Sequence, residues 1–161
     1  MTLHRPANVD EGQKLKSLIY EIVTNVKDLP VIFPIHPRTA TVFSEFGINA
    51  KNLHIVDPMG YMEFNYLVEH AKAVITDSGG ITEETTVMGV PCITLRDNTE
   101  RPETVSLGTN ELIGTNPVSI KPALENLFSG NWKKGEIPEL WDGNASVRIV
   151  EAISLIFSDI Y

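Results

Sequence analysis

The sequence predicts an α/β fold, a three-layer and doubly wound parallel sheet of the Rossmann-like kind. Short, continuously apolar runs alternate with longer segments in which apolar residues recur every three or four positions. The short runs are typical of strands buried on both faces, and the longer pattern is typical of helices with one apolar stripe. Because strands that alternate with helices at this spacing pair in parallel through right-handed crossovers, helices are expected on both faces of the sheet.

The first helix is the clearest element. It is expected between Asp10 and Asp28, and the pair Leu29-Pro30 ends it. Its apolar stripe consists of Leu15, Leu18, Ile19, Ile22, Val23 and Val26. The elements expected next, in chain order, are a strand at 31–35, a helix at 38–46, a strand at 53–56, a helix at 61–71, a strand at 73–76, a helix at 80–88 and a strand at 92–95.

The C-terminal part continues this alternation with less regular spacing. The elements expected there are a short helix starting at Pro102, a strand at 111–113, a helix at 117–128, a polar loop at 129–144 and a last helix at about 145–158. This last helix has an apolar stripe and is expected to pack back onto the domain. At the other end, residues 1–5 look like the tail of a strand and the loop after it, so either the first strand is very short or the chain is a piece of something longer.

Length and composition fit one domain and exclude several classes of function. At 161 residues and 17.8 kDa the chain can form one core, and its single cysteine, Cys92, lies in an apolar run where a buried, inert thiol is expected. The net charge of −8 disfavours general nucleic-acid binding, although local donors can still hold a small phosphorylated ligand. Without a run of roughly 20 apolar residues or a signal peptide, a cytoplasmic protein with no membrane partner is expected. No spacing indicates a metal site, and no cofactor is expected.

The glycine loop 77–80 is the sharpest candidate for a binding site, because ligands of open parallel sheets bind beyond the carboxyl ends of the strands. Gly79 and Gly80 let the backbone approach an anion at a helix N-terminus, and Ser78 adds a hydroxyl. An ordinary helix cap with a glycine turn explains the same residues equally well. Since the loop is neither a Walker A loop nor a dinucleotide fingerprint, a mononucleotide or a nucleotide sugar is the better fit.

Two charged residues could complete such a site. Glu84, one helical turn after Gly80, is placed to accept hydrogen bonds from a ribose diol, although the helix dipole alone also favours glutamate there. Arg101 has the planar guanidinium that suits two-point contact with a diphosphate. Considered singly, a simple ion pair of Arg101 with Glu100 or Glu103 is the favoured interpretation.

The remaining loops supply further candidates. His4 lies at the strand end that faces the glycine loop, where a ligand role and a structural role are equally supported. Arg5 beside it is a second cationic donor or a surface residue without a role, and His36 is ambiguous. In the loop 57–61 an aromatic side chain and exposed backbone groups could hold a base ring, whereas Phe64 beyond it suits the core better.

A set of short motifs runs through these loops in a fixed order. They are Thr2-Leu3-His4-Arg5 with Asn8, His36-Pro37, Asp57-Pro58, Thr76-Asp77-Ser78-Gly79-Gly80-Ile81 with Glu83-Glu84, Gly89-Val90-Pro91, and Arg96-Asp97 to Thr99-Glu100-Arg101-Pro102-Glu103. The set resembles the C-terminal half of the non-hydrolysing UDP-N-acetylglucosamine 2-epimerases. Because that family has a two-domain, glycosyltransferase-B-like architecture, the resemblance implies that residues 1–161 form a single nucleotide-sugar-binding domain and that the N-terminal catalytic domain is absent from this chain.

The resemblance implies a role for each candidate residue. The diphosphate of UDP would be held by His4, Ser78, Gly79, Gly80 and Arg101, the ribose by Glu84, and the uracil by Pro58, Met59, Tyr61 and Phe64. The family interconverts UDP-N-acetylglucosamine and UDP-N-acetylmannosamine by loss and re-addition of UDP, through a 2-acetamidoglucal, for cell-envelope polysaccharides. Its main acid/base carboxylates lie in the absent domain, so this chain is expected to bind UDP without epimerising the sugar, with His4 as its candidate catalytic residue.

One motif departs from the family pattern. The family continues its His-Arg pair with another residue and then Glu-Asn, whereas here Ala7 stands in the Glu position before Asn8. In bacterial members that Glu and the histidine matching His36 belong to a second, regulatory UDP-sugar site, to which Arg5 is also assigned. The departure puts this regulation in doubt and leaves the substrate site intact.

Two other functions fit the same residues. The donor-binding domain of a glycosyltransferase of the glycosyltransferase-B class would share the fold and the nucleotide site but transfer the sugar to an acceptor. A free-standing nucleotide-binding module would carry out neither reaction. The partners expected are UDP or UDP-N-acetylglucosamine and the N-terminal domain of the same enzyme, and homo-oligomerisation is left open.

Overall fold

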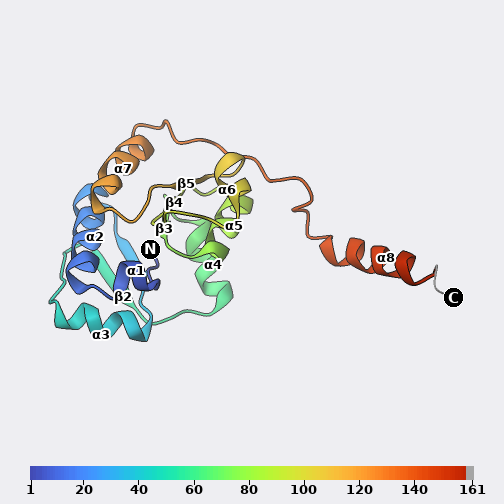
Figure 1. The fold of residues 1–161 in the computed structure, drawn as a ribbon. Coiled ribbons are helices and arrows are strands. Elements are labelled where there is room, and N and C mark those ends of the chain that lie inside the picture. The colour runs from blue at the N-terminus through green and yellow to red at the C-terminus, as the bar shows by residue number, and fades with distance from the viewer. Residues whose placement is uncertain (159–161) are drawn as a thin grey trace.

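The computed structural model describes residues 1–158, apart from the side chains of Arg38 and Ser158 (Figure 1). Its helices are α1 (Pro6–Val9), α2 (Gly12–Asn25), α3 (Pro37–Glu45), α4 (Tyr61–Glu69), α5 (Gly79–Met88), α6 (Pro102–Ser106), α7 (Ile120–Phe128) and α8 (Ala145–Ser158). Its strands are β1 (Val31–Pro34), β2 (Leu53–Val56), β3 (Val74–Thr76), β4 (Cys92–Thr94) and β5 (Asn110–Leu112). Every expected strand and helix is present with its ends shifted by a few residues, and the short helix α1 is an addition.

The sheet is parallel throughout. β1 pairs with β2, and β3, β4 and β5 pair in that order. Residues 1–3 run between the two groups, where Thr2 pairs in parallel with Thr76 and the Met1 amine donates to the carbonyl oxygen of Ile32 at 2.6 Å. The N-terminal residues therefore take the place of a short central strand, which we call the central segment (1–3).

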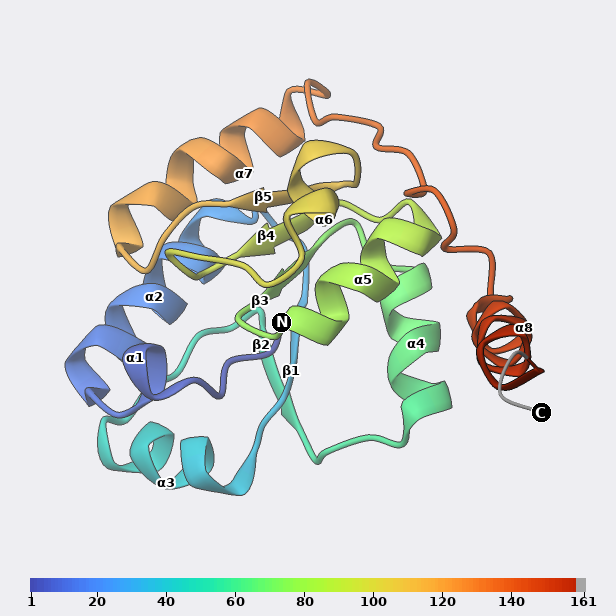
Figure 2. The same ribbon diagram turned by 45° about the vertical axis from the view of Figure 1, so that its right-hand side comes forward.

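This arrangement makes the sheet doubly wound. From the central segment the chain continues to β1 and then β2 on one side, and it returns to β3 and continues to β4 and β5 on the other side. Helices α1, α2, α3 and α7 cover one face, and α4, α5 and α6 cover the other (Figure 2). The direction of winding reverses between the central segment and β3, which is where open α/β sheets bind their ligands.

The main hydrophobic core lies under α2 and α7. The whole apolar stripe expected on the first helix is buried there, together with Phe33 of β1, Ile93 of β4 and Leu124 of α7. Cys92 is buried as a free thiol, and burial raises its pKa to about 11. The thiol therefore stays protonated at neutral pH, in agreement with the inert role expected for it.

The last helix differs from expectation. α8 extends away from the domain at the end of the segment that follows α7 (Figures 1 and 2). Its apolar side chains are exposed, namely Val147, Ile149, Val150, Ile153, Leu155, Ile156 and Phe157. The expectation that α8 packs back onto the domain is thus wrong for this structure, because α1 to α7 already cover both faces of the sheet. Helical periodicity indicates an apolar face but not the surface that covers it.

Within residues 1–158, no helix has both the length and the apolar composition needed to cross a membrane.

Candidate functional site

Asp77 joins the two loops that meet at the switch point. It follows β3, its side chain is fully buried, and its carboxylate accepts hydrogen bonds from the backbone N–H groups of His4 and Arg5 at 3.0 to 3.2 Å. The side-chain amide of Asn8 donates to the same carboxylate at 3.1 Å. Burial would raise the pKa of Asp77, but the hydrogen bonds from His4, Asn8 and the Arg5 backbone outweigh it and lower the pKa. Asp77 is therefore a buried anion at neutral pH.

The imidazole of His4 also contacts Asp77. Its Nδ1 lies 2.9 Å from Asp77 Oδ1, and its side chain is 48% exposed. The hydrogen bond to Asp77 raises the pKa of His4, while partial burial and the nearby charges of Arg5 and Arg96 act in the opposite direction. His4 is thus solvent-accessible at the carboxyl end of the central segment, which is the position expected from the sequence. Its role as a ligand donor stays a prediction.

α5 begins in the glycine loop, where no side chain caps its N-terminal N–H groups. Ser78 is the N-cap residue, its hydroxyl makes no capping hydrogen bond, and its N–H donates to Thr76 Oγ1 at 3.0 Å. A Cβ built on Gly80 would meet no atom within 4 Å, and one on Gly79 would meet only ordinary contacts at 3.5 and 3.6 Å. Neither glycine has a positive φ. Since neither packing nor backbone conformation requires glycine here, close approach of a ligand is the better explanation of the pair.

A buried arginine stands beside this loop. Arg96 is only 5% exposed, and its guanidinium contacts the carboxylate of Glu100 at two points, 2.6 and 2.7 Å away. Arg5 Nη2 lies 3.8 Å from the same carboxylate. Hydrogen bonds from Arg96 lower the pKa of Glu100 to about 2. The edge next to Gly79 therefore holds two arginines near one carboxylate. Arg96 belongs to one of the motifs, but it was given no binding role from the sequence, although it directly follows a buried strand.

Arg101 and Glu84 lie on the other side of the loop. The Arg101 Nε donates to a carboxylate oxygen of Glu83, so this pair joins the start of α6 to α5. The ion-pair partner of Arg101 is therefore Glu83 and not Glu100 or Glu103, the partners expected from the sequence. Burial raises the pKa of Glu84, a hydrogen bond from Tyr61 lowers it, and repulsion from Glu83 adds to the rise. The residues assigned to ribose and uracil, Glu84 and Tyr61, are therefore neighbours.

Other candidate residues are more scattered. Phe64 packs against the small cluster of Val68, Val74 and Val90, which is the core placement that suited it from the sequence. Pro58 is exposed and Met59 is half-buried. His36 is exposed just before α3. Roles for Pro58, Met59 and Phe64 in a uracil pocket stay predictions.

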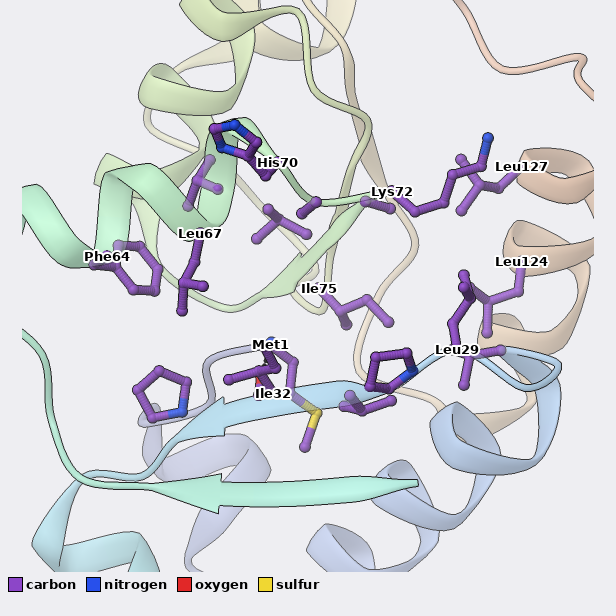
Figure 3. A pocket seen from close by; sticks show the side chains of 18 of the residues that line it. Met1, Leu29, Ile32, Phe64, Leu67, His70, Lys72, Ile75, Leu124 and Leu127 are labelled. Atoms are coloured by element: carbon purple, nitrogen blue, oxygen red, sulfur yellow. Dashed lines mark hydrogen bonds between the residues drawn. The ribbon is translucent and has the colours of Figure 1, made fainter. Parts of the chain in front are cut away.

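An apolar cavity of about 370 Å³ lies at the opposite end of the central segment (Figure 3). Met1, Ile32, Ile75, Leu67 and Leu124 are among the residues that line it. Its wall is predominantly hydrophobic, and His70 and Lys72 are the titratable side chains that line it. Because it lies away from the carboxyl ends of the strands, it is not the predicted nucleotide site. Within residues 1–158, no group of three or more His, Cys, Asp or Glu side chains is placed to hold a metal ion.

Fold and site together define a Rossmann-like α/β domain with a helix N-terminus at its switch point that no side chain caps. A sequence model of the family described as UDP-N-acetylglucosamine 2-epimerase matches residues 1–154. The chain belongs to this family, and the resemblance to the C-terminal half of these enzymes is confirmed.

Named relatives and solved structures agree with that assignment. The UDP-N-acetylglucosamine 2-epimerase of Methanocaldococcus jannaschii is 42% identical over 96% of this chain and 43% of the relative. The UDP-2,3-diacetamido-2,3-dideoxy-D-glucuronate 2-epimerase of Pseudomonas aeruginosa is 36% identical over 95% of this chain and 43% of its own length. The chain thus spans less than half the length of these curated relatives.

Two crystal structures show the same fold. The M. jannaschii enzyme in complex with UDP-GlcNAc and UDP superposes with a TM-score of 0.83 at 41% identity, over 96% of this chain and 44% of that one. The Neisseria meningitidis enzyme bound to UDP-GlcNAc gives a TM-score of 0.81 at 32% identity, over 94% of this chain and 43% of that one. The expected α/β class is confirmed.

Proposed function

We propose that this chain is the UDP-binding half of a UDP-N-acetylglucosamine 2-epimerase and that the 161 residues alone bind UDP without epimerising the sugar. The observation that carries the proposal is the N-terminus of α5 at the switch point, which no side chain caps. It lies beside the half-exposed His4, which contacts the buried carboxylate of Asp77, and beside the buried Arg96. Helix N–H groups and cationic side chains are the donors that a diphosphate requires.

Each part of UDP has a proposed place at this edge. The N–H groups of the first turn of α5, with His4, hold the diphosphate, and Arg101 joins them by exchanging the Glu83 carboxylate for a phosphate oxygen. Glu84 accepts hydrogen bonds from the ribose next to Tyr61, which contacts the base. In a reaction in which UDP leaves and returns, these donors also stabilise the charge of the leaving diphosphate.

The proposed partner is a second, N-terminal domain that supplies the acid/base carboxylates. Relatives more than twice as long as this chain support it. The regulatory site with Arg5 and His36 stays a prediction. Ala7 is exposed on α1, so packing would not prevent a glutamate at this position. The presence of alanine there therefore argues for a difference in ligand binding at the regulatory site. The cytoplasmic location also stays a prediction.

UDP is the part of the ligand on which the proposal rests. The names of the M. jannaschii and P. aeruginosa relatives specify different sugars, but both sugars are linked to UDP. The names of these relatives favour an epimerase over a glycosyltransferase donor domain, because both are 2-epimerases. No contact among the described residues favours the third candidate function, a free-standing nucleotide-binding module.

Calorimetric titration of the full chain with UDP tests the proposal. Saturable binding is expected, and Arg101→Ala should weaken it by about tenfold or more, since a charge-assisted contact is lost. Lys121→Ala is the matched control, because Lys121 is an exposed cation on α7 whose ion-pair partner is Glu125. No binding at millimolar UDP, or equal binding by the Arg101→Ala and Lys121→Ala chains, would contradict the proposed site.

A further inference from the structure

Asp77 makes more hydrogen bonds than a loop clamp requires. Its carboxylate accepts the backbone N–H groups of His4 and Arg5 and the side-chain amide of Asn8, which already fix the path of the loop after the central segment. The same carboxylate also contacts Nδ1 of the His4 ring at 2.9 Å. This last contact fixes the orientation of a half-exposed side chain, which contributes little to the core.

The contact decides what the far side of the ring can offer to a ligand. With its Nδ1–H donated to Asp77, a neutral His4 ring carries a lone pair on Nε2, which repels a phosphate oxygen. Only the protonated ring presents an N–H at Nε2. Asp77 favours that protonated form, because a buried carboxylate next to an imidazole stabilises its positive charge.

We propose that Asp77 is a positioning residue that holds His4 with its Nε2–H directed to the diphosphate of bound UDP, so that tight binding of UDP requires His4 to be protonated. The identity of the ligand rests on the proposed function, whereas the Asp77–His4 contact does not. His4 touches the ligand and is the binding group, and Asp77 acts only through it.

The charged groups around His4 fit this role. Asp77 raises the pKa of His4 through their hydrogen bond, against partial burial and against the positive charges of Arg5 and Arg96. Glu100 contacts both of those arginines and offsets their charge. The balance leaves His4 with a raised pKa at an edge where an anion is expected.

The test is the pH dependence of UDP affinity, measured by calorimetry on the full chain from about pH 6 to about pH 9. Affinity of the unaltered chain should fall as pH rises through the raised pKa of His4. In His4→Gln this fall should disappear. The pH dependence of affinity that remains should be that of the phosphate groups of UDP, which lose their last proton at about pH 6. In Asp77→Asn the fall should move to lower pH, with affinity about tenfold weaker at neutral pH.

A second measurement separates positioning from simple loss of structure. The titration of His4, followed by NMR of its ring protons without ligand, should shift to lower pH in Asp77→Asn. In the His4→Gln background, Asp77→Asn should cost no further UDP affinity, because Asp77 acts through the ring. If Asp77→Asn proves unfolded, the comparison of the unaltered chain with His4→Gln decides alone.

The outcomes distinguish this inference from the proposed function. Equal pH dependence in the unaltered and His4→Gln chains, with UDP bound by both, would overturn the role of His4 and Asp77 and leave the UDP site in place. An Asp77→Asn cost in UDP affinity that is as large without the His4 ring as with it would reduce Asp77 to a structural clamp. Absence of UDP binding to the unaltered chain would overturn both proposals.

Discussion

The same strands form both ends of the central segment, but the side chains at the two ends differ: polar and charged groups lie at one end and apolar groups at the other. At the carboxyl end, β3 leads to the buried Asp77, the glycine loop and the His4 ring. At the amino end, the same strands line an apolar cavity of about 370 Å³. A ligand is expected at the carboxyl end and not in the apolar cavity, because a parallel sheet gathers its loop donors and helix N-termini at one end only.

The largest expected effect is a loss of stability when a side chain that lines the apolar cavity is truncated. Leu124 is buried on α7 and lines the cavity, so Leu124→Ala should lower the free energy of unfolding by about 2–5 kcal/mol. UDP affinity of the folded protein should not change, since Leu124 is remote from the glycine loop. Urea denaturation and UDP calorimetry measure both quantities. Ile149→Ala, at an exposed position of α8, is the control and should leave both unchanged.

At the carboxyl end, Gly80→Val should have the opposite pattern: a loss of UDP affinity with little change in stability. A Cβ added at position 80 would meet no protein atom within 4 Å, so the free energy of unfolding should stay within about 0.5 kcal/mol of the unaltered chain. UDP affinity should fall by about tenfold or more, because the backbone can no longer approach the phosphates closely. Thr41→Val, at an exposed position of α3, is the matched control. Unchanged UDP affinity in Gly80→Val would refute the account of the glycine pair.

Glu100→Gln should have a smaller effect of the opposite sign. The Glu100 carboxylate neutralises Arg96 and lies near Arg5 beside the glycine loop, so its removal leaves these cations available to an anion. UDP should bind about two- to fivefold more tightly, with a steeper dependence on salt. Weaker binding would show instead that Glu100 is needed to aim the loop that carries Arg101.

The smallest effect is the pH dependence of stability. Because the pKa of His4 is raised, its contribution is complete below its ordinary value of 6.5 and is lost as pH rises through the folded value. Because the pKa of Asp77 is lowered, its contribution is complete above its ordinary value of 3.8 and is lost as pH falls through the folded value. Thermal unfolding of His4→Gln should therefore lack the loss on the alkaline side, and a loss as large as in the unaltered chain would contradict the ion pair.

Local sequence patterns predicted the elements of this fold but not the contacts between them. The stripe of α2 and the apolar strands follow from periodicity and burial, whereas α1 is too short for any periodicity to reveal. The positions of His4 and the glycine loop at strand ends drew attention to them, and the order of the motifs indicated the family. The Arg101–Glu83 pair and the hydrogen bonds of Asp77 join residues far apart in sequence, and only the folded sheet brings them together.

NMR titration of the labelled chain with UDP can locate the nucleotide at one end of the sheet or the other, because each backbone amide reports its own surroundings. We expect saturable shifts for the amides of His4 and of Ser78–Gly80, and none for cavity residues such as Ile32 and Leu124. Shifts confined to the cavity, with an unmoved glycine loop, would contradict the assignment of UDP to the carboxyl end of the sheet.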